Sequence, residues 1–291
     1  MPAAAATGKT KGTSGTPAYS RRVKIDRAFC DDLERAELAG LRNVVKNASR
    51  RFAHLHPQAS EIGGGLAAFA GVNSPISEAL GIGLWEPAGR SEAEALTAFY
   101  HERGAQPRVR CSPYADSAFI RALIDLGYVP LEYENPMAAD LATLGAHRDA
   151  RVTLMRDPNE WSAATGTAFL DGAPCDESNL VVGLMVCTPS ETTALEIREA
   201  DAIVASGCMD VQGAFAGFYG AGTAPAFRGR GLQKALIVDR AARGLERGAR
   251  FGRVTTRPGT ISEQNFRRLG FVPLYTRTLW GIPCNESASS P

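Results

Sequence analysis

The residues of this 291-residue chain best suited to chemistry form one short basic segment, RGRGLQK at 228–234. Its two glycines lack side chains, so backbone N–H groups there can approach a ligand closely. Two arginines and a lysine add positive charge, and no acidic residue follows until Asp239. These residue types in this spacing favour a site for a phosphate or pyrophosphate group.

A strand and a helix must hold that segment in place. Strand-like residues end at "YGAGT" (219–223), and a helical pattern runs from Leu232 to about Arg247, where Gly248 is suited to end the helix. The N–H groups at a helix N-terminus and the helix dipole both attract anions. We therefore expect a pyrophosphate cradle; the alternative is a solvated basic loop that only begins the helix.

Two other phosphate motifs do not fit. "GAGTAP" at 220–225 begins like the dinucleotide-binding GxGxxG, but Pro225 takes the position of the third glycine. No acidic residue follows at the spacing of a ribose contact, and the sequence has no GxxxxGK[ST] pattern. Neither NAD binding nor nucleotide hydrolysis is expected.

The chain repeats part of its sequence. Leu-Gly-Tyr-Val-Pro-Leu begins at Leu126, and Leu-Gly-Phe-Val-Pro-Leu begins at Leu269. In both places a helix-like segment precedes the glycine and a strand-like run follows it. Upstream, each half also has a glycine-rich turn, a helix and a short strand, at 107–111 and 252–256. The repeat predicts a duplicated α/β domain, with its boundary near 138–149.

The two halves differ where the helix begins. The matching helix of the first half opens with "GRSEAEALTAFY" at 89–100, in which we expect Ser91 and Glu94 to form a capping box. Glu92 and Glu94 also put negative charge where a phosphate would lie. The sequence therefore predicts an anion site in the second half only.

The second half resembles the GNAT superfamily of acyl-CoA-dependent N-acetyltransferases over about residues 150–283. The family signature, Arg/Gln-x-x-Gly-x-Gly/Ala opening a helix, is similar to Arg228 through Gln233, with Pro225 three residues before the arginine. "NFRRLGF" at 265–271 is similar to the family's closing segment. The first half resembles a degenerate copy, so the whole chain looks like a tandem-GNAT protein.

The resemblance implies an α/β (α+β) fold of two tandem GNAT-like domains, each a mixed, mostly antiparallel sheet flanked by helices. We expect a tail at 1–22, a degenerate domain without a cofactor site at 23–145, an acetyl-CoA-binding domain at 146–284 and a tail at 285–291. The first tail is rich in Ala, Gly, Ser and Thr; it loosely resembles a transit peptide, but a plain disordered tail fits better.

The resemblance also implies where acetyl-CoA binds. The strand before the cradle would bond the pantetheine arm through free backbone groups, the helix N-terminus would hold the pyrophosphate, and Asn265 would lie near the acyl end. The cofactor-binding residues implied in this way are Ala221, Gly222, Thr223, Arg228, Gly229, Arg230, Gly231, Leu232, Gln233, Lys234 and Asn265.

Two departures from the family pattern bear on catalysis. Gln233 replaces the last Gly/Ala of the signature, and Phe266 stands where many members have a tyrosine that protonates the leaving thiolate. A phenyl ring cannot donate a proton, so Tyr219 and Tyr275 are the candidate catalytic acids. Core packing is the alternative for both tyrosines. Water is another proton source, and a thiolate can also leave unprotonated.

Strand alternation places Tyr219 on one face with Gly217, Ala221 and Thr223, which the family geometry would turn toward the cofactor. The chemistry implied by the resemblance is direct attack of an amine on the thioester carbonyl, which a backbone amide polarises. Positioning would supply much of the rate.

The amine site is less defined by the sequence. Asp210 and Glu196 are candidates for the general base, and neither is favoured. Glu132 and Glu134 are candidates for binding a cationic amine, with a solvated strand edge as the alternative reading. Because pockets favour domain interfaces, the first half is expected to shape the substrate entrance of the second.

Composition excludes several classes of protein. A net charge of +1 argues against nucleic-acid and membrane partners, and no apolar run has the length of a membrane helix. The six cysteines are scattered, as in a cytoplasmic protein with reduced thiols rather than a disulfide framework. His54 and His56 have no further ligand nearby, so no metal is expected.

The sequence thus predicts a cytoplasmic N-acetyltransferase that moves an acetyl group from acetyl-CoA to a small-molecule or peptide amine in a ternary complex. The alternative is a non-catalytic acyl-CoA-binding regulatory protein. The sequence does not define the acceptor or the acyl chain length, and it allows a homodimer.

Overall fold

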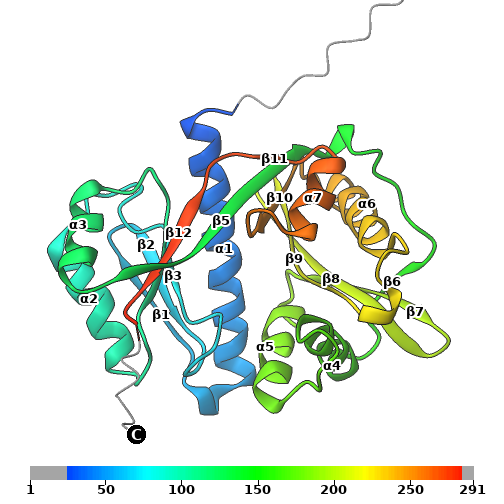
Figure 1. Cartoon of the computed structure of the whole chain (residues 1–291), viewed down its shortest axis with the longest axis horizontal. Helices are drawn as coiled ribbons and strands as arrows, with labels where there is room; N and C mark the ends of the chain where they lie inside the picture. The colour runs from blue at the N-terminus through cyan, green and yellow to red at the C-terminus, as the bar shows by residue number, and fades with distance from the viewer. Residues whose placement is uncertain (1–24, 284–291) are drawn as a thin grey trace, which may run out of the picture.

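A computed structural model gives the structure of residues 25–283 (Figure 1). The two expected tails, 1–22 and 285–291, lie outside the described residues. The described residues form two α/β halves that share one 12-stranded sheet of order β1-β2-β3-β4-β12-β5-β10-β9-β8-β7-β6, with β11 paired to β5. Most neighbouring strands are antiparallel, as expected.

The first half follows the predicted order of elements, after one long helix. Its glycine-rich turn, helix, short strand and second helix lead into the long strand β5, and Gly127 ends the second helix with φ +86°. The elements are α1 (Arg27–Arg51), η1 (Ala53–Leu55), β1 (Gln58–Ile62), β2 (Gly65–Phe69), β3 (Ala79–Leu80), α2 (Arg90–His101), β4 (Arg108–Cys111), α3 (Ser117–Asp125) and β5 (Val129–Asp140).

The second half repeats this order and adds a pair of helices before its central strands. Gly248 and Gly270 end two of its helices with φ +85° and +98°. Its elements are η2 (Leu141–Thr143), β6 (Val152–Leu154), α4 (Pro158–Phe169), α5 (Glu177–Cys187), β7 (Thr193–Glu199), β8 (Ala202–Gln212), β9 (Phe215–Thr223), η3 (Pro225–Phe227), α6 (Leu232–Glu246), β10 (Phe251–Thr256), α7 (Ile261–Arg268), β11 (Val272–Pro273) and β12 (Arg277–Gly281).

Two strands are exchanged between the halves. The C-terminal strand β12 lies in the sheet of the first half, between β4 and β5, where Thr278 pairs with both Cys111 and Tyr133 (Figure 1). The later part of β5 in turn pairs with β10 of the second half, from Asn135 to Asp140. The sheet is therefore continuous across the halves, while the domain limits near residue 145 stay a prediction.

Helix α1 lies between the two halves (Figure 1). The Asp26 side chain caps it by accepting from the Phe29 N–H at 3.0 Å. Leu33 is buried with Phe215 of β9, and Ala48 is buried with Met185 of α5. Each half also has its own apolar core, so α1 forms the shared wall of a space between them.

The hairpin of α4 and α5 is packed closely enough to form a second wall. A Cβ on Gly183 would lie 2.0 Å from the Ser162 hydroxyl oxygen, and one on Gly166 would lie 2.3 Å from the Cys175 sulfur. Only glycine allows the two helices to approach this far.

Candidate active site

The basic segment forms an open helix N-terminus. Gly231 begins α6 with φ +75°, Gly229 has φ +76°, and a Cβ on either would meet nothing within 4 Å. Among the described residues, no side chain caps α6 and its first turn carries no acidic residue. The first N–H groups of a helix have no partner within the helix, so these groups can bind an anion placed here.

The charged residues of the segment hold it against neighbouring elements. Arg228 donates from Nε to the Thr223 carbonyl at 3.2 Å and pairs with Asp171, while Arg230 pairs with Glu199 at 2.6 Å. Both arginines are about half exposed, so these surface pairs leave them able to meet a phosphate.

The remaining residues of the segment divide between core and surface. Leu232 has a buried side chain among the apolar residues of α6, so only its backbone faces outward, whereas Lys234 is exposed. Gln233 accepts from the Asn265 amide at 2.7 Å. This contact ties Asn265 to the first turn of α6, and its place near the acyl end of the cofactor stays a prediction.

The helix α2 of the first half begins differently, and one expectation was wrong. The capping residue is Glu92, which accepts from the Gly89 N–H at 2.7 Å; Ser91 donates to Glu92, and Glu94 pairs with Arg90. The helix begins two residues earlier than the expected Ser91–Glu94 box requires, with Gly89 in place of Ser91 as the N-cap. A carboxylate still occupies the helix N-terminus.

Strands β9 and β10 separate before the cradle. They pair in parallel from Phe215 to Gly217, with Arg253 as the last partner, and β9 then continues to Thr223. Beyond Gly217 the backbone groups on this side of β9 have no β10 partner. This is the stretch that contains Ala221, Gly222 and Thr223.

The predicted alternation of side chains along β9 was wrong, because β9 contains a bulge. Between the pairs Ser206↔Gly222 and Cys208↔Tyr219, β8 has one residue and β9 has two, and Gly220 adopts φ +55°. The Ala221 side chain therefore lies on the α6 side, 3.4 Å from a Cβ built on Gly207. Ala221 does not share a face with Tyr219, because the extra residue reverses the alternation.

A cavity of about 540 Å³ lies between the halves. It is lined by α1, the segment around Pro75 and Ile76, β3 and β4 from the first half, and by α4, α5, β8, β9 and β10 from the second. It reaches β9 at Tyr219 and Gly220, beside the strand that leads to the cradle. Residues of both halves therefore line this cavity, while its use as a substrate pocket stays a prediction.

Five charged groups line this cavity, namely Glu37, Glu78, Arg110, Asp210 and Arg253. Asp210 and Arg253 pair at 3.2 Å above Gly217, where a Cβ would lie 2.4 Å from the Asp210 carboxylate. The absence of a side chain at Gly217 is thus what lets this ion pair lie across β9, where β9 and β10 begin to separate.

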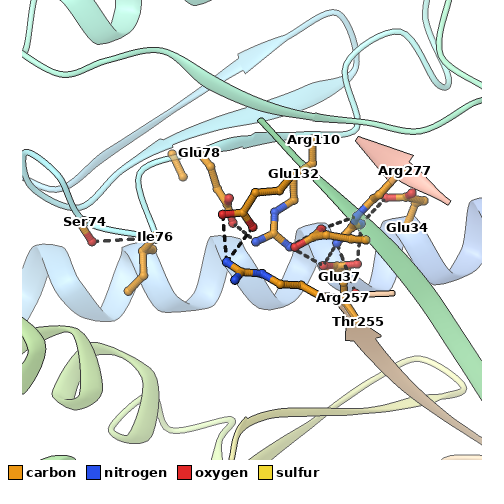
Figure 2. A network of polar contacts seen from close by, with 12 residues as sticks. Glu34, Glu37, Ser74, Ile76, Glu78, Arg110, Glu132, Thr255, Arg257 and Arg277 are labelled. Atoms are coloured by element: carbon orange, nitrogen blue, oxygen red, sulfur yellow. Dashed lines mark hydrogen bonds and ion pairs between the residues drawn. The ribbon is translucent and has the colours of Figure 1, made fainter. Parts of the chain in front are cut away.

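Glu78 contributes a carboxylate from the first half (Figure 2). Its Oε1 lies 2.8 Å from Arg110 Nη2, while its Oε2 is buried without a hydrogen-bond partner among the described residues. Burial raises the pKa of Glu78, although the nearby Arg110 opposes this. A raised pKa makes Glu78 a stronger base than an ordinary glutamate.

Behind the cavity, Arg277 of β12 is fully buried and binds three glutamates (Figure 2). Its guanidinium lies 2.6 Å from Glu37, 3.1 Å from Glu134 and 3.3 Å from Glu34. Burial raises the pKa of Glu34. Burial would also raise that of Glu37, but Arg277 outweighs it and holds the pKa of Glu37 at about 2. The network joins the exchanged strand to the cavity wall.

The two candidate tyrosines occupy different places. Tyr219 lines the cavity, its hydroxyl shares a 2.8 Å hydrogen bond with Thr192, and burial raises its pKa well above the ordinary value. Tyr275 donates to Glu34 at 2.5 Å and does not line the cavity; burial raises its pKa as well. Phe266 is buried against Phe271, with ring centroids 4.9 Å apart.

The acidic residues considered for the general base and for amine binding also lie in different places. Asp210 lines the cavity, whereas Glu196 does not and instead pairs with Arg198 at 3.0 Å. Glu132 pairs with Arg257 at 2.8 Å, and Glu134 lies in the Arg277 network; neither lines the cavity.

Sequence reasoning missed Glu37, Glu78, Arg110 and Arg253 as site residues. They come from a helix, the loop before β3 and two strands that lie far apart in the sequence. The available signal was an arginine inside each of two short strand patterns, "PRVRC" and "GRVTT". A buried arginine in a strand needs an acidic partner, but the pattern does not say which one.

A second cavity of about 830 Å³ adjoins the first through Pro75, Asn179 and Val182, and His54 and His56 line it. Within residues 25–283 no cluster of His, Cys, Asp or Glu has the arrangement of a metal site. In the same range, no helix combines the length and apolar character needed to cross a membrane. The five cysteines described are unpaired thiols.

No protein-family profile and no curated protein matches this chain. Among solved structures, a GCN5-related N-acetyltransferase from Kribbella flavida has a TM-score of 0.58 at 18% identity, covering 82% of this chain and 95% of its own. A tandem GNAT protein from the clavulanic acid biosynthesis pathway has a TM-score of 0.53 at 14% identity, covering 88% of this chain and 95% of its own. The chain therefore has the tandem GNAT fold that its sequence resembles.

Proposed function

We propose that this protein is an N-acetyltransferase that moves an acetyl group from acetyl-CoA to an amine in a ternary complex. The observation that carries the proposal is that one strand, β9, joins two suitable binding regions. Its Tyr219–Gly220 segment lines the cavity between the halves, and its free edge leads to the open N-terminus of α6. Acetyl donor and acceptor can thus meet at β9.

The chain offers a fitting site for each part of acetyl-CoA. Backbone groups of Ala221 to Thr223 would bond the pantetheine arm, and the first turn of α6, from Gly229 to Lys234, would hold the pyrophosphate. The open space at Gly229 and Gly231 supports this assignment. When bound, acetyl-CoA supplies the acetyl group as a reactive thioester.

The cavity residues would prepare the amine. The amine nitrogen forms a bond to the carbonyl carbon as the carbon–sulfur bond breaks, and the ammonium form of the acceptor gives up two protons. One proton ends on the sulfur of CoA and the other is released to solvent. Glu78 is the proposed first acceptor of a proton, because one of its oxygens has no partner among the described residues and its pKa is raised by burial.

Tyr219 remains the proposed proton donor to the sulfur, since it is the tyrosine that lines the cavity. Tyr275 is assigned a positioning role through Glu34 and the Arg277 network. Location in the cytoplasm is proposed with the function.

Calorimetric titration with acetyl-CoA, followed by a CoA-release assay over a broad panel of amines, tests the proposal. We expect binding and amine-dependent release of CoA. Binding without release for any amine would favour the alternative, a non-catalytic acyl-CoA-binding protein. If folded protein does not bind acetyl-CoA, both the enzyme hypothesis and the acyl-CoA-binding hypothesis are wrong.

A further inference from the structure

The cavity between the halves combines an apolar wall with a charged end. The wall is formed by Leu41, Val44, Ile76, Phe169, Val182 and Val186, which come from α1, the segment before β3, α4 and α5. Polar groups of a ligand placed along this wall would lose their hydrogen bonds to water without replacement. The wall therefore selects for an acceptor with a hydrocarbon skeleton.

The charged end has an excess of negative charge. Three carboxylates, Glu37, Glu78 and Asp210, face two guanidinium groups, Arg110 and Arg253. Glu78 is only 8% exposed, and its Oε2 has no hydrogen-bond partner among the described residues. A buried carboxylate oxygen without a partner is costly, and a cation bound beside Glu78, which lines the cavity, would offset part of that cost.

We propose that the acceptor is a primary amine on an apolar skeleton, without a carboxylate, whose ammonium group binds Glu78 while the skeleton lies along the apolar wall. This inference rests on the proposed function and names the acceptor class of the same site. An amino acid would bring its carboxylate beside three acidic side chains, and the two arginines there already pair with Glu78 and Asp210. A polyamine would bury further ammonium groups against hydrocarbon.

Three probes separate these classes: 2-phenylethylamine, phenylalanine, which adds a carboxylate to the same skeleton, and spermidine. We expect kcat/KM for 2-phenylethylamine to exceed that for phenylalanine by about a hundredfold or more, because like charges are brought together in a low-dielectric site. We expect spermidine to be a poor acceptor. Preferred acetylation of phenylalanine or spermidine would overturn the inference while leaving the proposed function intact.

Glu78→Gln tests the charged end. Glutamine keeps an oxygen that can accept from Arg110, and Arg110 also keeps Glu134 at 3.2 Å. We expect the affinity for 2-phenylethylamine to fall by about tenfold or more, with the affinity for acetyl-CoA unchanged. An unchanged amine affinity would contradict the assignment of Glu78.

Phe169→Ala tests the apolar wall. Phe169 is 65% exposed, so its loss is expected to leave the fold intact, and Leu154, 58% exposed and outside the cavity lining, gives the matched control Leu154→Ala. We expect Phe169→Ala to weaken the binding of 2-phenylethylamine several-fold more than the binding of ethylamine. We expect Leu154→Ala to leave the affinity for both amines unchanged. Equal effects of Phe169→Ala on both amines would contradict the proposed position of the skeleton.

Amine binding is measured by calorimetry with CoA present, so the inference is tested without turnover. If 2-phenylethylamine binds in a way that depends on Glu78 but is not acetylated, the proposed amine site is supported. The proposal that the protein is an enzyme is then wrong. Transfer to other amines without binding of 2-phenylethylamine would overturn the inference alone.

Discussion

Lys234 stands in α6 at the position that Glu92 holds in α2: each is the third residue after a glycine that begins its helix. In α2, the Glu92 carboxylate accepts from the Gly89 N–H at 2.7 Å and occupies the helix N-terminus. In α6, the same position carries a cation, and the N–H groups remain available to an anion. The charge at one position distinguishes the closed end of α2 from the open end of α6.

Lys234→Glu should give α6 a carboxylate-capped N-terminus like that of α2. The new carboxylate can cap the helix and repel a pyrophosphate, so we expect acetyl-CoA affinity to fall by about tenfold or more. Thermal stability should be unchanged or higher, since a capping interaction is gained. Calorimetry and thermal unfolding measure the two effects.

The control for this change is Lys234→Gln, which removes the positive charge without adding a negative one. We expect a smaller loss of affinity than in Lys234→Glu. Full acetyl-CoA affinity in Lys234→Glu would show that the first turn of α6 does not hold the pyrophosphate.

Tyr219→Phe and Tyr275→Phe should have different effects. If Tyr219 protonates the leaving sulfur, its loss lowers kcat by about a hundredfold, while the lost hydrogen bond to Thr192 costs about 0.5–1.5 kcal/mol of unfolding free energy. Loss of the Tyr275 hydroxyl removes one partner from buried Glu34 and should cost about 1–3 kcal/mol of unfolding free energy. Steady-state kinetics and urea unfolding check both. A kcat unchanged in Tyr219→Phe would leave water as the proton source.

Gly217→Ala should displace the ion pair above β9. Its Cβ would lie 2.4 Å from Asp210 Oδ1 and 2.6 Å from Arg253 Nη2, so the pair must move. We expect CoA release to fall more strongly than acetyl-CoA affinity, because the pair lies at the cavity. Gly89→Ala, where a Cβ meets nothing within 4 Å, is the control. Equal loss of both readouts would instead indicate a general disturbance of the sheet.

Glu37 should make stability depend on pH in the acid range. Burial opposes its ionisation, but Arg277 holds its pKa at about 2, below the ordinary value of about 4.3. The unfolded chain therefore binds more protons in this interval, so the contribution of Glu37 is complete above about pH 4.3 and is lost as the pH falls through about 2.

Glu37→Gln isolates this contribution. Removing one partner of a buried ion pair should cost about 3–5 kcal/mol near neutral pH. The difference from the wild type should narrow as the pH falls from about 4.3 through about 2, because Glu37 becomes protonated in the folded state as well as in the unfolded one. Denaturant unfolding at several pH values measures it, and a difference independent of pH would contradict the assigned pKa.

The sequence by itself determined the repeated elements and the glycine-rich, basic beginning of α6. Glycines in fixed places ended the helices at Gly127, Gly248 and Gly270, since a left-handed residue is needed there and glycine adopts it without strain. The order of the repeated strands and helices followed from local patterns and from the repeat, whereas α1, α4 and α5 were not predicted. The open end of α6 could be predicted because its residues are consecutive in the chain, so their chemistry and their position are both local.

The tertiary structure alone decided the cavity between the halves. Glu37, Glu78, Arg110, Asp210 and Arg253 meet because α1 lies between the halves and the sheet runs across both. The exchange of β12 and the bulge at Gly220 change which side chains face one another, and neither leaves a periodic signal. Such contacts depend on long-range pairing, whose energy is a sum over the whole fold rather than a property of any one segment.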